Sequence, residues 1–216
     1  MDWKIGIDEV GRGCLAGHVS VGAVMVQVDA KPIPGVDDSK KLSPKKRESV
    51  HRTILETPSV FVAVTSAPVE VIDRVGIDKA VLACFERAAR RLLAIAEEKG
   101  LGPVVSIKID GRAPNAPFMP GFPIEFVING DATDWLIGAA SIVAKVTRDR
   151  QMVELAKEFP GYGWEHNAGY GTAVHEAAIR TLGLTAMHRT KFCRKFATPI
   201  NPMIPKEDPG IFDLFE

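Results

Sequence analysis

Short apolar stretches rich in β-branched residues recur along the chain and predict strands. Runs of continuous or alternating apolar residues, bounded by Gly, Pro or Asp, are typical of strands that are at least half buried. Such stretches lie at residues 3–8, 18–28, 59–65, 103–109 and 123–128. A glycine-rich turn links the first two of them.

Segments with helical spacing lie between and after these strands. Ser43 can cap a helix over residues 44–56 that begins with a proline, a favourable first position. Residues 68–99 predict a short helix followed by a longer one, which Gly100 stops. Two further helices are predicted at 135–159 and 172–182.

The alternation of strands and helices implies an α/β protein with a mixed central sheet and helices on both faces. The apolar fraction of 46% and the charged fraction of 25% fit a globular chain, and 216 residues can bury a substantial core. We expect residues 1–197 to form one domain that ends in a C-terminal helical region. Residues 198–216 contain four prolines and predict a flexible tail.

Charge and cysteine content exclude several classes of protein. The 27 basic and 27 acidic residues balance, so attraction to nucleic acid must come from local patches. The three cysteines form no CxxC pair, which argues against a disulfide framework or a structural zinc site. No stretch approaches the roughly 18 apolar residues of a membrane span, and the start has no signal-peptide pattern. We therefore expect a cytoplasmic protein without a membrane partner.

Three of the predicted strands run directly into acidic residues: Asp8 and Glu9, Asp110, and Asp131. If these strands are neighbours, four carboxylates meet at one edge of the sheet. Like charges about 4 Å apart repel by roughly 4 kcal/mol per pair at an effective dielectric near 20. Such a cluster must therefore bind protons or cations, and hard divalent cations prefer oxygen ligands. Alternatively, each acid is an ordinary strand-end or turn residue.

The stretch GIDEVGRGCLAG at residues 6–17 favours a functional site. Gly6 and Asp8 share one face of a strand, so the missing side chain at Gly6 is expected to leave room for a bulky substrate beside Asp8. Glu9 points the other way in an ideal strand. It can join Asp8 only if the strand ends or twists there, which Gly11 and Gly13 permit.

These residues resemble ribonuclease HII, the type 2 ribonuclease H family. The matching segments occur in family order and cover about residues 3–195. They are GIDEVGRG at 6–13, DSKKLS at 38–43, IDG at 109–111, GD at 130–131, AASIVAKVTRD at 139–149, NAGYGT at 167–172 with His175, and HR at 188–189.

The resemblance implies a ribonuclease H-like fold and an endoribonuclease that uses Mg²⁺ or Mn²⁺. It implies hydrolysis of the RNA strand of RNA–DNA hybrids and nicking 5′ to ribonucleotides in duplex DNA, with 3′-hydroxyl and 5′-phosphate ends. Two divalent ions about 3.5–4 Å apart can activate a water and stabilise the leaving oxygen. The implied metal-binding and catalytic acids are Asp8, Glu9, Asp110 and Asp131.

The resemblance also implies substrate-reading residues. The Gly11-Arg12-Gly13 turn corresponds to the one that reads the ribose 2′-hydroxyl, and a turn with few side chains lets backbone groups approach that hydroxyl. Tyr170 corresponds to the tyrosine that packs on the adjoining deoxyribose. The chain departs from the family near this turn, with Val10 in place of the usual Ala and Cys14 and His18 in place of Pro. These differences concern recognition of the RNA–DNA junction, and none of them replaces a carboxylate.

Basic residues add weaker candidates. The DSKKLS match favours Ser39 and Lys40 as substrate contacts, and Lys145 on a predicted helix is a further candidate. By contrast, residues 45–47 are predicted to form a solvated helix face, and Arg148 with Asp149 a structural charge pair or helix surface. His175 and His188 are predicted to be structural because no other ligand stands at metal-binding spacing. Arg189 is predicted to be structural or to extend the nucleic-acid surface.

The remaining predictions concern partners. Ile211-Phe212-Asp213-Leu214-Phe215 resembles the short hydrophobic motifs that dock on sliding clamps, although Ile211 replaces the usual glutamine; an apolar end on a flexible tail is the alternative. We expect a monomer. The rival functions are a DNA resolvase on the same fold and a hybrid-binding protein without catalysis. Ribonuclease HIII is disfavoured because Asp8 lies too near the start for that family's extra N-terminal domain.

Overall fold

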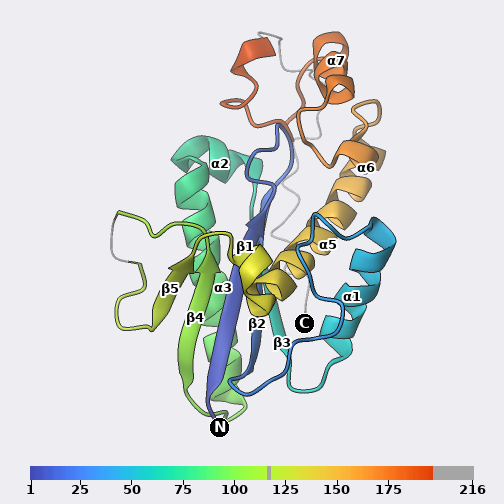
Figure 1. The fold of residues 1–216 in the computed structure, drawn as a ribbon. Helices are drawn as coiled ribbons and strands as arrows, with labels where there is room; N and C mark the ends of the chain where they lie inside the picture. The colour runs from blue at the N-terminus through green and yellow to red at the C-terminus, as the bar shows by residue number, and fades with distance from the viewer. Residues whose placement is uncertain (116–117, 197–216) are drawn as a thin grey trace. The chain divides into compact units, whose positions relative to one another are not determined.

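A mixed five-stranded sheet lies at the centre of the computed structural model, which describes residues 1–115 and 118–196 (Figure 1). The strand order is β3-β2-β1-β4-β5. β1 is antiparallel to β2 and parallel to β4, and β4 is parallel to β5. The strands are β1 (Trp3–Val10), β2 (Val19–Gln27), β3 (Phe61–Ala67), β4 (Val104–Asp110) and β5 (Ile124–Val127). The predicted mixed sheet is therefore confirmed.

The helices predicted at 44–56, within 68–99, at 135–159 and at 172–182 are confirmed with boundaries shifted by at most one residue, whereas the short helices at 130–133, 164–167 and 194–196 were not predicted. The described helices are α1 (Pro44–Glu56), α2 (Val69–Val75), α3 (Ile77–Glu98), α4 (Gly130–Thr133), α5 (Trp135–Glu158), α6 (Trp164–Asn167), α7 (Ala173–Leu182) and the short 3-10 helix η1 (Arg194–Phe196). The Ser43 hydroxyl caps α1 by accepting from Lys46 N–H at 3.3 Å, as predicted. None of the described helices is long and apolar enough to cross a bilayer.

The described chain divides into two compact units. The first consists of Met1–Val10, Ser20–Thr65 and Val81–Val146, and it holds most of the sheet. The second consists of Gly11–Val19, Ser66–Ala80 and the chain from Thr147 onward. The predicted tail at 198–216 and the predicted clamp motif at 211–215 lie outside the described residues.

Helices cover both faces of the sheet in the first unit. Side chains of α1 and α5 form one apolar cluster with Val24 and Val26 of β2. α3 covers the opposite face (Figure 1), where the Thr65 hydroxyl of β3 donates to the Cys84 carbonyl at 2.9 Å. The strands are therefore buried on two sides, which agrees with their nearly continuous apolar sequences.

The glycine at position 6 makes room for a helix rather than for substrate, so that part of the prediction is wrong. A Cβ atom on Gly6 would lie 2.6 Å from the backbone carbonyl carbon of Leu136 in α5. The backbone of α5 thus approaches β1 at a distance that only glycine allows. The sequence shows that a side chain is missing at this position but not which element uses the space.

Two predicted strand ends also differ in the structure. β1 does not stop at Asp8, because Glu9 and Val10 continue the pairing with Val21 and Ser20 of β2. β5 ends four residues before Asp131, which lies instead in the single-turn helix α4. The intervening Asn129 has a left-handed backbone with φ of 55°, a conformation that asparagine tolerates better than most residues.

Candidate active site

Three carboxylates meet beside the parallel strands β1 and β4. Asp8 and Glu9 lie near the end of β1, and Asp110 is the last residue of β4. Because Ile7 pairs with Ile109, the residues that follow them arrive side by side. One oxygen atom of each carboxylate lies within 4.8 Å of the other two. Three of the four predicted acids therefore meet at one place.

The charge of this cluster is unfavourable without a cation. Burial raises the pKa of Asp8 well above its usual value, and the neighbouring charges of Glu9 and Asp110 add to the effect. Burial also raises the pKa of Asp110, although a hydrogen bond from Gly130 N–H opposes this. Carboxylates that resist ionisation and offer only oxygen atoms fit a hard divalent cation such as Mg²⁺ or Mn²⁺.

Asp131 lies next to this cluster, but its carboxylate faces a lysine. Asp110 Oδ1 accepts from the N–H groups of Gly130 at 2.6 Å and Asp131 at 3.4 Å, so the start of α4 is held at Asp110. The Asp131 side chain pairs with Lys40, whose Nζ lies 2.8 Å from Oδ2. This hydrogen bond is the main reason that the pKa of Lys40 is raised. Lys40 itself is largely exposed.

Ser39 lies beneath the cluster rather than at the surface. Its hydroxyl is 3.0 Å from the Ser141 hydroxyl, and Ser141 hydrogen bonds to Asp8. Arg47 is also buried and donates from Nε to the Ser39 carbonyl at 2.9 Å and from Nη2 to the Leu42 carbonyl. The prediction of a solvated face at 45–47 is therefore wrong for Arg47, because loop carbonyls satisfy its guanidinium. Lysines 45 and 46 are exposed as predicted.

Ser141 is a residue that sequence reasoning missed. It is the only polar residue in the run AASIVA, and it is 4% exposed. A buried polar side chain in an apolar helical run needs a hydrogen-bond partner, so the sequence could have predicted a specific hydrogen bond at this position. Lys145, a predicted substrate contact farther along α5, is half-buried.

Two buried arginines shape the Gly11-Arg12-Gly13 turn in the second unit. Arg148 donates to the carbonyls of Ala16, His18 and Ala168 at 2.7–3.1 Å. Arg189 donates to the carbonyls of Arg12, Gly17 and His18 at 2.9–3.0 Å. Both side chains are completely buried. The structural role predicted for Arg189 agrees with these contacts, and the alternative of a nucleic-acid surface does not. For Arg148, the alternative of a helix surface is wrong, because its side chain is buried.

The turn itself requires its first glycine. Gly11 has a φ of +86°, and a Cβ atom there would lie 2.1 Å from Nε of Arg148. A Cβ on Gly13, by contrast, would meet no atom within 4 Å. The Arg12 side chain is about half exposed and forms an ion pair with Asp78. Backbone groups of the turn can thus be approached closely from the side of Gly13.

Tyr170 is 39% exposed, and its backbone is anchored by a histidine pair. Its carbonyl accepts from Nδ1 of His175 at 2.9 Å. Nε2 of His175 lies 2.9 Å from Nε1 of Trp164 and 3.1 Å from Nε2 of His188. Burial lowers the pKa of both histidines, that of His188 to about 3. Both histidines are structural, as predicted.

Known proteins resemble this chain over most of its length. The family model for Ribonuclease HII matches residues 5–195. Ribonuclease HII of Rhodospirillum rubrum is 44% identical over 191 residues, covering 87% of this chain and 82% of the relative. Ribonuclease HII of Thermosynechococcus vestitus is 40% identical over 191 residues, covering 88% and 83%.

Solved structures share the fold. The ribonuclease HII in a complex with PCNA from Archaeoglobus fulgidus superposes with a TM-score of 0.72 at 24% identity, covering 87% of this chain and 94% of that chain. The ribonuclease H2 of Pyrococcus horikoshii gives a TM-score of 0.63 at 23% identity, covering 90% and 96%. Family model, curated relatives and fold agree, and the chain belongs to the ribonuclease HII family.

Proposed function

We propose that this protein is a metal-dependent endoribonuclease that hydrolyses the RNA strand of RNA–DNA hybrids and nicks duplex DNA 5′ to an embedded ribonucleotide. The products are 3′-hydroxyl and 5′-phosphate ends. The observation that carries the proposal is the cluster of Asp8, Glu9 and Asp110, whose oxygens lie within 4.8 Å of one another in a ribonuclease HII family member.

In this proposal, Asp8, Glu9, Asp110 and Asp131 would hold two divalent ions. When bound, Mg²⁺ or Mn²⁺ supplies a Lewis acid that activates water and stabilises the leaving oxygen. The protein's part is to place the carboxylates. Ser141 orients Asp8 by a hydrogen bond, and Asp110 holds the start of α4 beside it.

Lys40 has a second role in this reaction. Its ammonium group forms an ion pair with Asp131 and is largely exposed. If a metal ion bound the Asp131 carboxylate, Lys40 would be able to bind a substrate phosphate instead. Lys145 is a further proposed phosphate contact. Ser39 acts through Ser141 rather than by touching the substrate, since its side chain is buried.

Recognition of the ribonucleotide is assigned to the second unit. Backbone groups of Gly11, Arg12 and Gly13 hydrogen bond to the 2′-hydroxyl, which alone separates RNA from DNA at one sugar. The Tyr170 ring packs on the neighbouring deoxyribose, where a 2′-hydroxyl would collide with it. We also propose that the chain from Thr147 onward serves substrate binding, while the sheet carries the chemistry.

The test is a DNA duplex with one ribonucleotide, incubated with Mg²⁺ or Mn²⁺, with the cut position mapped. Wild-type protein should cut 5′ to the ribonucleotide, and Asp8→Asn should reduce the rate at least about a thousandfold. Asp29→Asn is the matched control, because Asp29 is exposed and outside the cluster. Cleavage of an all-DNA junction instead would favour a resolvase, and binding without cutting would favour a hybrid-binding protein.

A contact with a sliding clamp through residues 211–215 is a separate proposal. The archaeal ribonuclease HII with the same fold is in a complex with PCNA, which motivates the test. Deleting residues 209–216 should abolish binding to the bacterial clamp in a pull-down or calorimetric titration while hydrolysis of a hybrid continues. Equal clamp binding with and without these residues would reject the contact.

A further inference from the structure

We propose that the ion pair between Lys108 and Asp134 is a positioning device for the metal-binding acids, because it holds the short helix α4 against β4 and so keeps Asp131 beside Asp110. The inference deepens the proposed function and rests on it. It concerns two residues that do not contribute to the carboxylate cluster.

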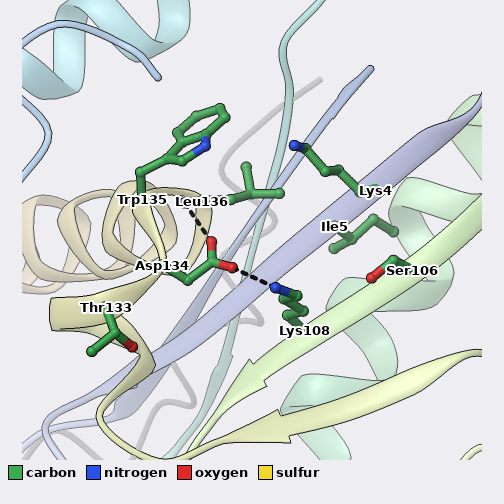
Figure 2. Close-up of a pocket in the computed structure, with 8 residues that line it drawn as sticks. All are labelled: Lys4, Ile5, Ser106, Lys108, Thr133, Asp134, Trp135 and Leu136. Carbon is green, nitrogen blue, oxygen red and sulfur yellow. Dashed lines mark hydrogen bonds and ion pairs between the residues drawn. The ribbon is translucent and has the colours of Figure 1, made fainter. Parts of the chain in front are cut away.

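The pair connects the two elements that carry the acids. Lys108 is two residues before Asp110 on β4, so both side chains lie on the same face of the strand. Asp134 follows α4 directly and is three residues after Asp131. Nζ of Lys108 lies 2.9 Å from Oδ2 of Asp134, and Figure 2 shows the two side chains pointing toward each other across the gap between β4 and the α4–α5 corner.

Contacts with β4 hold α4 at both ends. At its start, Gly130 N–H donates to Oδ1 of Asp110. At its end, Asp134 N–H donates to the Gly130 carbonyl at 2.8 Å, and the Asp134 side chain reaches Lys108. A helix of four residues is not stable in isolation, because the free energy lost in nucleating a helix exceeds the free energy gained from one turn of hydrogen bonds. These two attachments to β4 therefore contribute to the position of Asp131.

Asp134 also starts the next helix. Its Oδ1 accepts from Leu136 N–H at 2.9 Å, the usual role of an N-cap residue, while Oδ2 faces Lys108. The two oxygens thus have separate tasks. Asparagine caps helices about as well as aspartate but carries no charge, so Asp134→Asn removes the ion pair and keeps the cap.

The pair is partly shielded from water and lies apart from the clustered carboxylates. Lys108 and Asp134 line a small pocket of about 170 Å³, together with Trp135 and Lys4, whose Nζ lies 5.6 Å from the centre of the indole ring (Figure 2). The Asp134 side chain is only 19% exposed, so water screens the pair less than it screens a surface pair. None of the clustered carboxylates lines this pocket.

The experiment measures Mn²⁺ binding directly by the loss of the free-ion signal in electron paramagnetic resonance. Asp134→Asn and Lys108→Met should each raise the Mn²⁺ dissociation constant about three- to tenfold. Lys108→Arg should stay near wild type, since it keeps the charge. The double variant should raise the Mn²⁺ dissociation constant no more than either single variant does, because the two partners act as one unit. The Mg²⁺ concentration that gives half-maximal nicking should rise by the same factor.

A matched control separates positioning from general stability. Arg90→Met removes an ion pair with Glu86 that lies on the exposed face of α3, and it should leave Mn²⁺ affinity unchanged. Unchanged affinity in both Asp134→Asn and Lys108→Met, in protein with a wild-type circular dichroism spectrum, would overturn the inference. An equal loss in Lys108→Arg would also count against it. If the wild-type protein neither binds Mn²⁺ nor nicks, the proposed function itself fails.

Discussion

Replacing His188 tests the buried histidine pair through the pH dependence of stability. Nδ1 of His188 accepts from Thr185 N–H at 2.9 Å, so the neutral ring carries its hydrogen on Nε2 and donates to Nε2 of His175. That atom also accepts from Trp164, which assigns the hydrogen of His175 to Nδ1 and to the Tyr170 carbonyl. An added proton on either ring would therefore face an N–H donor.

The size of the effect follows from the pKa of His188. Burial, followed by the charge of His175, lowers this pKa from 6.5 to about 3. Between these two pH values, the unfolded chain binds more protons at His188 than the folded one does. The contribution of His188 to the free energy of unfolding is therefore fully present above pH 6.5 and is lost as the pH falls. Lowering the pH from 7 to 5 should cost the folded state about 2 kcal/mol through this group.

The assay is urea unfolding at pH 7 and pH 5, followed by tryptophan fluorescence. At pH 7, His188→Asn should unfold about 1–3 kcal/mol more easily, because it keeps an acceptor for Thr185 but loses the bond to His175. At pH 5 the difference in the free energy of unfolding between variant and wild type should be about 2 kcal/mol smaller. The reason is that the variant has no histidine at position 188, so its unfolded chain gains no proton there. Groups common to both proteins cancel.

His166→Asn is the control for this measurement. His166 is exposed and lies outside the buried pair, so its variant should show the same gap to wild type at both pH values. A gap between His188→Asn and wild type that stays constant from pH 7 to pH 5 would refute the neutral, fully bonded histidine pair.

Two further predictions concern the first unit. Gly6→Ala should lower the free energy of unfolding by about 1–3 kcal/mol, because its Cβ would collide with the Leu136 backbone; urea unfolding measures this, and unchanged stability would contradict the close packing of α5 on β1. Asp8→Asn should raise the melting temperature in EDTA, since it removes a buried charge whose pKa is raised. Added Mg²⁺ should raise the melting temperature of the wild-type protein but not that of Asp8→Asn. An equal rise in both proteins would argue against Asp8 as a metal ligand.

The order of elements could be predicted because it depends on local signals. Apolar runs, the Ser43 cap and the glycine after α3 mark the elements without tertiary information. The approach of Asp8 to Asp110 also followed, since neighbouring parallel strands bring their ends to one edge of the sheet.

Other features depend on partners that no sequence pattern marks. Arg148 and Arg189 bind backbone carbonyls, which every residue possesses, so nothing in the spacing of side chains indicates the contact. The helix that fills the space at Gly6 is likewise invisible in the strand's own sequence. The placement of Asp131 depends on one left-handed residue, Asn129, and on a single helical turn.

The dependence of the amino-terminal turn on Arg189 has a consequence for biosynthesis. The Arg12 carbonyl receives its hydrogen bond from a residue 177 positions later, so this turn acquires its final shape later than its place in the chain suggests. A nascent chain that stops before position 189 carries complete strand sequences and an unformed opening turn. The turn that we propose reads the ribonucleotide can therefore take its final shape only after Arg189 has been synthesised.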